Sequence, residues 1–127
     1  IPLFSEAVSA GFPSPAQDYI EKALDLNELC IKRPAATFFV RVEGDSMIQA
    51  GIYAGDILVV DRSVTAEHGD TVIVAIHGEM TVKELELRPV VRLVPRNPDY
   101  PVIDIPEGTV LDIFGVVTNV IRNIRHK

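Results

Sequence analysis

The sequence predicts a mainly β fold, in which a β-rich body of antiparallel strands follows an N-terminal arm that contains a short helix. β-branched and aromatic residues gather in short runs from Thr37 onward. Gly-bearing turn sequences separate these runs, as tight connections between antiparallel neighbours require. The preceding residues show no alternating pattern and hold three of the nine prolines within their first 15 positions. We therefore divide the chain into an arm, residues 1–36, and a body, residues 37–127.

The arm contains one segment with a helix signature, "SPAQDYIEKAL" at residues 14–24. Ser14 is a suitable N-cap, Pro15 fits the first helical position, and Gln17 completes a capping box. Apolar residues then recur at helical spacing and form one stripe, which consists of Ala16, Tyr19, Ile20, Ala23 and Leu24. We expect a short amphipathic helix whose stripe docks on another surface.

The body contains seven runs with strand composition. They are residues 37–43, 56–62, 70–77, 79–87, 91–95, 101–106 and 110–121. The sequences between them include "AGD", "EHGD", "HGE" and "PEGT". These short turns favour a meander or a partly closed barrel over a parallel sheet.

Composition excludes several classes of protein. The net charge of -6 opposes binding to phosphates, so we expect no direct sequence-specific DNA binding. The longest apolar run, "VIVAI", is far shorter than the ~18 residues of a membrane span, so no membrane association is expected. With one cysteine, the chain forms no intrachain disulfide, and the cytoplasm is the expected location. The chain begins with Ile1 rather than Met, which suggests a fragment.

No cofactor or metal site is expected. His68, His77 and His126 show no metal-ligand spacing around Cys30. The glycine patterns that bind nucleotide phosphates are absent from the sequence. Any chemistry must therefore come from ordinary side chains.

Lys83 stands in an unusual place for a lysine. Side chains alternate along "MTVKELEL", so Lys83 shares a face with Leu85 and Leu87. A lysine near a strand end usually extends its ammonium into water, and the strand alone favours that interpretation. A desolvated lysine would instead lose its proton and become a general base. At an unshifted pKa of about 10.4, only about one lysine in 2,500 is neutral at pH 7, and burial can lower that pKa by about 3 to 5 units.

Ser46 is the candidate nucleophile. Gly44 gives the backbone freedom after a strand, Asp45 can cap, and "SMIQA" can begin a helical turn. The backbone N–H groups of Ser46 and Met47 are then candidates for stabilising an oxyanion. "GDS" also fits an ordinary turn, and only proximity to Lys83 would distinguish the two interpretations.

Two segments of the body resemble the self-cleaving serine/lysine peptidases of the LexA and UmuD group. They are "GDSMIQAGIYAGDILVVDR" and "GDTVIVAIHGEMTVKELELRP", which carry Ser-Met in a turn and a lysine on a later strand. The arm is similar to the UmuD branch, including the region "AGFPSP". The resemblance implies a LexA/UmuD-like, signal-peptidase-like fold. It also implies that Ser46 is the nucleophile, Lys83 the general base and Ala10-Gly11 the scissile bond.

The same resemblance implies a role in the SOS response to DNA damage. RecA filaments on single-stranded DNA would stimulate self-cleavage, and the shortened homodimer would join a UmuC-type polymerase for error-prone synthesis past lesions. One departure is Glu84, which follows the lysine where members of the group often have a second basic residue. Two alternatives stay open: the catalytic domain of a LexA-type repressor, and a non-catalytic β-rich interaction module.

Overall fold

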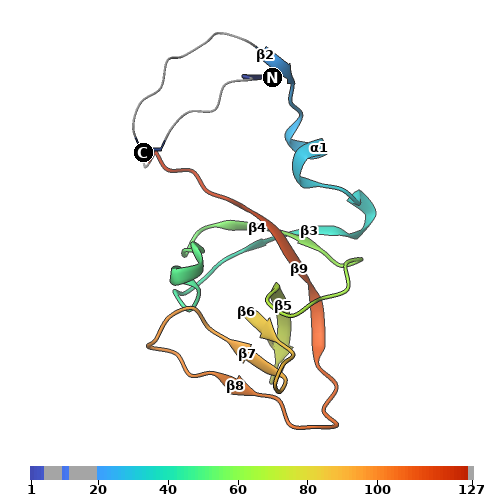
Figure 1. Ribbon diagram of the computed structural model, residues 1–127, viewed down its shortest axis with the longest axis vertical. Coiled ribbons are helices and arrows are strands. Elements are labelled where there is room, and N and C mark those ends of the chain that lie inside the picture. Colours follow the sequence, from blue (N-terminus) through green and yellow to red (C-terminus); the bar gives the residue numbers. More distant parts are fainter. Residues whose placement is uncertain (5–9, 12–19, 126–127) are drawn as a thin grey trace. The chain divides into compact units, whose positions relative to one another are not determined.

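The computed structural model describes residues 1–4, 10–11 and 20–125 (Figure 1). The chain forms two compact units, residues 1–32 and 33–127. The division into an arm, residues 1–36, and a body, residues 37–127, stays a prediction from the sequence.

The first unit holds a two-stranded ribbon and one short helix. Strand β1 (Pro2–Phe4) pairs antiparallel with β2 (Ile20–Ala23). Helix α1 (Leu26–Cys30) follows, and the Asp25 carboxylate caps it by accepting a hydrogen bond of 2.9 Å from the Asn27 N–H. An aspartate at this position satisfies one of the donors that a helix start leaves free.

The helix expected at residues 14–24 is wrong for its C-terminal part. Residues 14–19 lie outside the described residues, whereas Ile20–Ala23 forms a strand. An isolated helix of this length is marginal unless its apolar face packs on a partner. Pairing with β1 satisfies the backbone of Ile20–Ala23 directly, and the helix begins later, behind the better-placed cap at Asp25.

The second unit is built on one antiparallel sheet of seven strands (Figure 1). The strands are β3 (Thr37–Arg41), β4 (Ile57–Asp61), β5 (Thr71–Ile76), β6 (Glu79–Glu86), β7 (Arg92–Val94), β8 (Ile103–Asp104) and β9 (Asp112–Ile121). Each predicted run contains one of them, which confirms the mainly β fold. The order across the sheet is β3-β4-β9-β5-β6-β7-β8.

Strands β5 to β8 form the expected meander, whereas β9 inserts between β4 and β5. The turn from β5 to β6 is tight because Gly78 takes a left-handed φ of 79°. On β9, Gly115 lies where the strand passes very close to β4. A Cβ at this position would lie only 2.6 Å from Val60 Cγ1, so the close approach needs glycine.

Two apolar clusters stabilise the second unit. One contains Val72, Val74, Leu85, Leu93 and Val116, and the other contains Val42, Met47, Ile52, Leu58, Val60 and Ile73. The second cluster includes residues of the loop that follows β3. Burial of Met47 and Ile52 against β4 and β5 therefore anchors the loop that carries Ser46.

Candidate active site

Ser46 lies in a turn between β3 and the short 3₁₀ helix η2 (Ile48–Ala50). Gly44 has a φ of 79°, a left-handed conformation that lets the chain reverse just before the serine. The following residue, Met47, is buried in the apolar core. Burial of Met47 thus fixes the turn, while Ser46 itself stays partly accessible.

Lys83 lies on β6, opposite Val72 of β5. Strand β7 pairs only with residues 84–86 of β6, so the part of the strand that carries Lys83 has one described neighbour, β5. The lysine is only 7% exposed, and none of the ion pairs among the described residues includes it. Burial without a counter-charge lowers the pKa of Lys83 below its usual range. Its ammonium therefore does not extend into water as an ordinary strand-end lysine would.

The structure brings Ser46 and Lys83 together. Lys83 Nζ lies 3.1 Å from Ser46 Oγ, 2.8 Å from Thr81 Oγ1 and 3.0 Å from the Val82 carbonyl oxygen. Three acceptors match the three protons of an ammonium. After loss of one proton, the amine can still donate to Thr81 and Val82 while its lone pair faces the Ser46 hydroxyl. The geometry thus suits both protonation states, and the lowered pKa makes the neutral amine more populated than it is in an exposed lysine.

The loop between β7 and β8 supports the turn before Ser46. The buried side chain of Asn97 donates from Nδ2 to the Asp45 carbonyl oxygen at 2.9 Å. The Tyr100 hydroxyl donates to Asp45 Oδ1 at 2.6 Å, and this bond to the carboxylate raises the pKa of Tyr100. Sequence reasoning missed Asn97 and Tyr100, because "RNPDY" has only the composition of a turn.

The two candidate oxyanion donors have backbone N–H groups available. Across the residues that the structure describes, neither the Ser46 N–H nor the Met47 N–H donates a hydrogen bond. The next residue, Ile48, does use its backbone N–H, which donates a hydrogen bond of 3.4 Å to the Asp45 carbonyl oxygen. Free donors beside a nucleophile are what an oxyanion requires.

Two hollows flank the Ser46 and Lys83 pair. A cleft of about 230 Å³ borders Ser46 and runs between the end of β3 and the start of β6; its lining consists of residues 40–43, Ser46, Leu58, Ile73 and residues 80–82. A second hollow, about 290 Å³, borders Lys83, Tyr100 and Ile103. Thr81 lines both. The pair therefore lies within reach of a segment that occupies the first cleft.

Ala10 and Gly11 belong to the other unit, where both residues are exposed. An ideal Cβ at Gly11 would have no atom within 4 Å.

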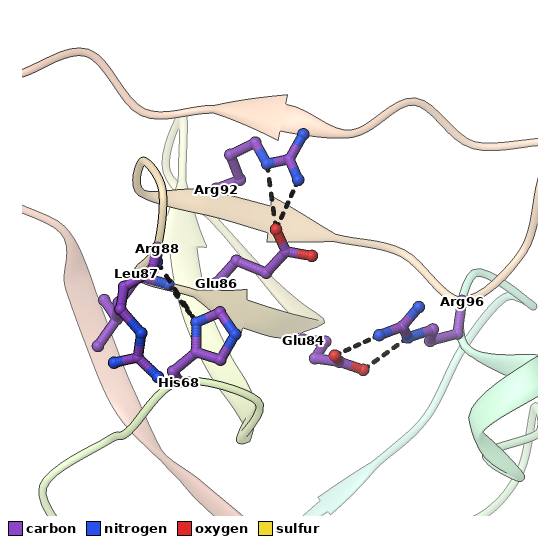
Figure 2. Close-up of polar contacts among 7 residues, drawn as sticks. All are labelled: His68, Glu84, Glu86, Leu87, Arg88, Arg92 and Arg96. Carbon is purple, nitrogen blue, oxygen red and sulfur yellow. Dashed lines mark hydrogen bonds and ion pairs between the residues drawn. The ribbon is translucent and has the colours of Figure 1, made fainter.

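His68, one of the histidines considered as a metal ligand, instead makes a hydrogen bond with the backbone. His68 Nδ1 accepts a hydrogen bond of 2.9 Å from the Leu87 N–H (Figure 2). Cys30 is a free thiol in the first unit. Within residues 1–4, 10–11 and 20–125, no three His, Cys, Asp or Glu side chains are placed to hold a metal ion. The helices in this part of the chain are too short to cross a membrane.

Comparison with known proteins gives one family and a set of relatives. A family model described as Peptidase S24-like matches residues 2–118. Protein SamA of Salmonella typhimurium is 55% identical over 124 residues, which cover 98% of this chain and 86% of SamA. Protein MucA of Escherichia coli is 52% identical over 120 residues, covering 94% and 82%. The LexA repressor of Halorhodospira halophila is 40% identical over 118 residues, covering 91% of this chain and 52% of the repressor.

Proposed function

The chain belongs to the Peptidase S24-like family, and from this premise we propose that it is a serine peptidase that cuts its own Ala10-Gly11 bond. One observation carries the proposal. A buried lysine without a counter-charge lies 3.1 Å from the hydroxyl of a turn serine. This is the geometry of a nucleophile next to its base.

In the proposed reaction, neutral Lys83 takes the proton of Ser46 Oγ as that oxygen attacks the carbonyl carbon of Ala10. The oxyanion that forms accepts hydrogen bonds from the backbone N–H groups of Ser46 and Met47. When the C–N bond breaks, the Lys83 ammonium returns the proton to the amine of Gly11. Water then hydrolyses the ester on Ser46, again with Lys83 as the base.

No histidine or aspartate is needed for this chemistry. An unshifted lysine would face a deficit of roughly 4.6 kcal/mol to be neutral at pH 7. Burial of Lys83 acts against that deficit, because it disfavours the charged form. The hydrogen bond to Thr81 fixes the amine toward Ser46 instead of letting it rotate freely.

The cleft beside Ser46 suits an extended peptide with small side chains. Its walls come from β3, which is an edge strand, and from the stretch of β6 before Lys83. Exposed backbone groups on strand edges can pair with an added segment. Ala10 and Gly11 have little or no side chain, so a peptide bond between them can approach a nucleophile closely.

We place this reaction in the SOS response. The relatives SamA and MucA match nearly the whole chain at 52 to 55% identity, and the arm resembles the UmuD branch. On this basis RecA filaments on single-stranded DNA stimulate the cut, and the shortened homodimer serves as accessory subunit of a UmuC-type, error-prone translesion polymerase. A partner that assembles on cellular DNA places the protein in the cytoplasm. The net charge of -6 fits a protein that meets DNA through its partners.

A second candidate is the catalytic domain of a LexA-type repressor, which the 40% identity to a LexA repressor favours. The higher identity to SamA and MucA, over most of their length, supports the accessory subunit instead. A non-catalytic module would have no need of a desolvated lysine against a serine, since burial of a lone lysine costs free energy.

Sequencing of the product's N-terminus tests the proposed function. Incubation of the full chain with RecA, single-stranded DNA and a nucleotide should yield a product that begins at Gly11. The same mixture without RecA serves as the control and should react more slowly. A new N-terminus elsewhere would overturn the choice of bond. An uncut chain, with RecA or at alkaline pH, would overturn the peptidase itself.

A further inference from the structure

We propose that the ion pair of Glu84 and Arg96 is a clamp that positions the Ser46 turn against Lys83. Both are positioning residues, because neither touches the reacting atoms. The inference rests on the proposed self-cleavage and names the residues that set the position of Ser46 relative to Lys83. It also gives a role to Glu84, the residue that departs from the pattern of the resembling peptidases.

One end of the clamp is fixed to the strand of the lysine. Glu84 directly follows Lys83 on β6 and pairs with Val94 of β7. Its carboxylate accepts two hydrogen bonds from one guanidinium: Arg96 Nε donates to Oε2 at 2.6 Å, and Arg96 Nη2 donates to Oε1 (Figure 2). A bidentate pair of this kind fixes direction as well as distance.

The other end of the clamp is fixed to the turn of the serine. The Arg96 N–H donates to the Ser46 carbonyl oxygen at 2.8 Å, and the Arg96 carbonyl accepts from the Gln49 N–H at 2.8 Å. The backbone of one residue therefore holds both ends of the segment 46–49. The side chain of Arg96 binds Glu84, the residue next to Lys83. A continuous path of hydrogen bonds thus joins Ser46 to β6 without passing through the reacting groups.

The magnitudes separate a role in positioning from a role in stability. The Arg96 and Glu84 side chains are 41% and 18% exposed, so solvent screens the ion pair and limits its contribution to the free energy of unfolding. Misplacement of a reacting group by about 1 Å can cost about 100-fold in rate. If the clamp is lost, Met47 and Asn97 still hold the loop. We therefore expect a slower reaction in a folded protein.

The same face of the sheet offers a matched control. Two residues further along β6, Glu86 Oε1 accepts from Arg92 Nε at 3.2 Å and from Arg92 Nη2 at 2.6 Å (Figure 2). The side chains of Arg92 and Glu86 are 35% and 20% exposed, close to the values of the first pair. Within the described residues, no hydrogen bond joins Glu86 or Arg92 to the segment 42–52. The second pair lies on the same strand, has the same charged groups and has similar exposure, but it lacks the link to Ser46.

The test compares these two pairs in the full chain. First-order self-cleavage is measured at alkaline pH without RecA, together with the midpoint of thermal unfolding. Glu84→Gln and Arg96→Gln should each slow cleavage about 10-fold to 100-fold. Glu86→Gln and Arg92→Gln should leave the rate unchanged, while all four variants shift the midpoint by similar amounts. The exchange Glu84→Arg with Arg96→Glu restores an ion pair and should recover most of the rate.

Three results would overturn the clamp: equal rates for Glu84→Gln and Glu86→Gln, equal losses in both pairs, or a folded exchange variant as slow as Glu84→Gln. Should Glu84→Gln unfold, the exchange variant decides the question alone. An unaltered chain that does not cut itself would instead contradict the proposed function, so the two failures are distinguishable.

Discussion

Replacement of Ser46 by alanine should reduce self-cleavage at Ala10-Gly11 by about 1,000-fold or more, because it removes the proposed nucleophile, whose hydroxyl lies 3.1 Å from the amine of Lys83. Lys83→Ala should cause a loss of similar size, since Ser46 would then have no group to take its proton. Lys83→Arg should be equally inactive, because a guanidinium keeps its proton at any pH at which proteins fold. The measurement is the rate of product formation by electrophoresis and mass spectrometry.

Matched controls separate this effect from a general effect of substitution. Thr65→Ala removes an exposed hydroxyl and Lys32→Ala an exposed ammonium, and both variants should cut at the unaltered rate. Circular dichroism should show that Ser46→Ala and Lys83→Ala keep the sheet. Continued cutting at Ala10-Gly11 by either folded variant would show that the assignment of nucleophile and base is wrong.

The second large effect concerns stability. The Asp56 side chain is 2% exposed and accepts hydrogen bonds from Arg122 Nε at 2.7 Å, from Arg122 Nη2 at 2.6 Å and from the Tyr53 N–H at 2.8 Å. Asp56→Ala removes all three bonds, and each bond to a buried carboxylate is worth more than one between neutral groups. We expect a loss of about 2 to 3 kcal/mol in the free energy of unfolding. Denaturant titration measures it.

The same carboxylate predicts a dependence on pH. The hydrogen bond from Arg122 is the main reason why the pKa of Asp56 lies below its ordinary value. Its contribution is therefore complete above the pKa of an unfolded aspartate, about 3.9, and is lost as the pH falls through the lower folded pKa. Acid should destabilise the unaltered chain more than Asp56→Ala. Asp112 is exposed, so the free energy of unfolding of Asp112→Asn should stay within about 0.5 kcal/mol of that of the unaltered chain. An equal loss of stability in Asp112→Asn and Asp56→Ala would refute the stabilising role of the Asp56 carboxylate.

Much of the sheet was predictable, because strand composition and turn glycines are local signals. All seven expected runs contain strands. The position of β9 was not predictable, since its partners β4 and β5 lie far away in the sequence and are chosen by packing. The helix at residues 14–24 shows the opposite error. Its capping residues and spacing are local preferences, and pairing between β1 and β2 overrides them at Ile20–Ala23.

The candidate site was predictable in its residue types but not in its geometry. Alternation along β6 placed Lys83 on the face of Leu85, and the structure shows that both are buried. The distance from Lys83 to Ser46 depends on how the turn after β3 folds back, which no periodicity contains. The residues that hold the Ser46 turn were not predictable either, because their contacts are tertiary. Arg96 and Asn97 act through tertiary contacts to a loop about 50 residues earlier.

The pH dependence of self-cleavage in the unaltered full chain, without RecA, tests most directly whether Lys83 is the base for Ser46. The rate should be measured from pH 6 to 10, with circular dichroism to show that the fold is intact. Since only the neutral amine reacts, we expect the rate to rise about tenfold per pH unit below the folded pKa of Lys83. Because burial lowers that pKa, the rise should level off before the ordinary lysine value of about 10.4. A flat profile across this range, with the fold intact, would contradict the assignment.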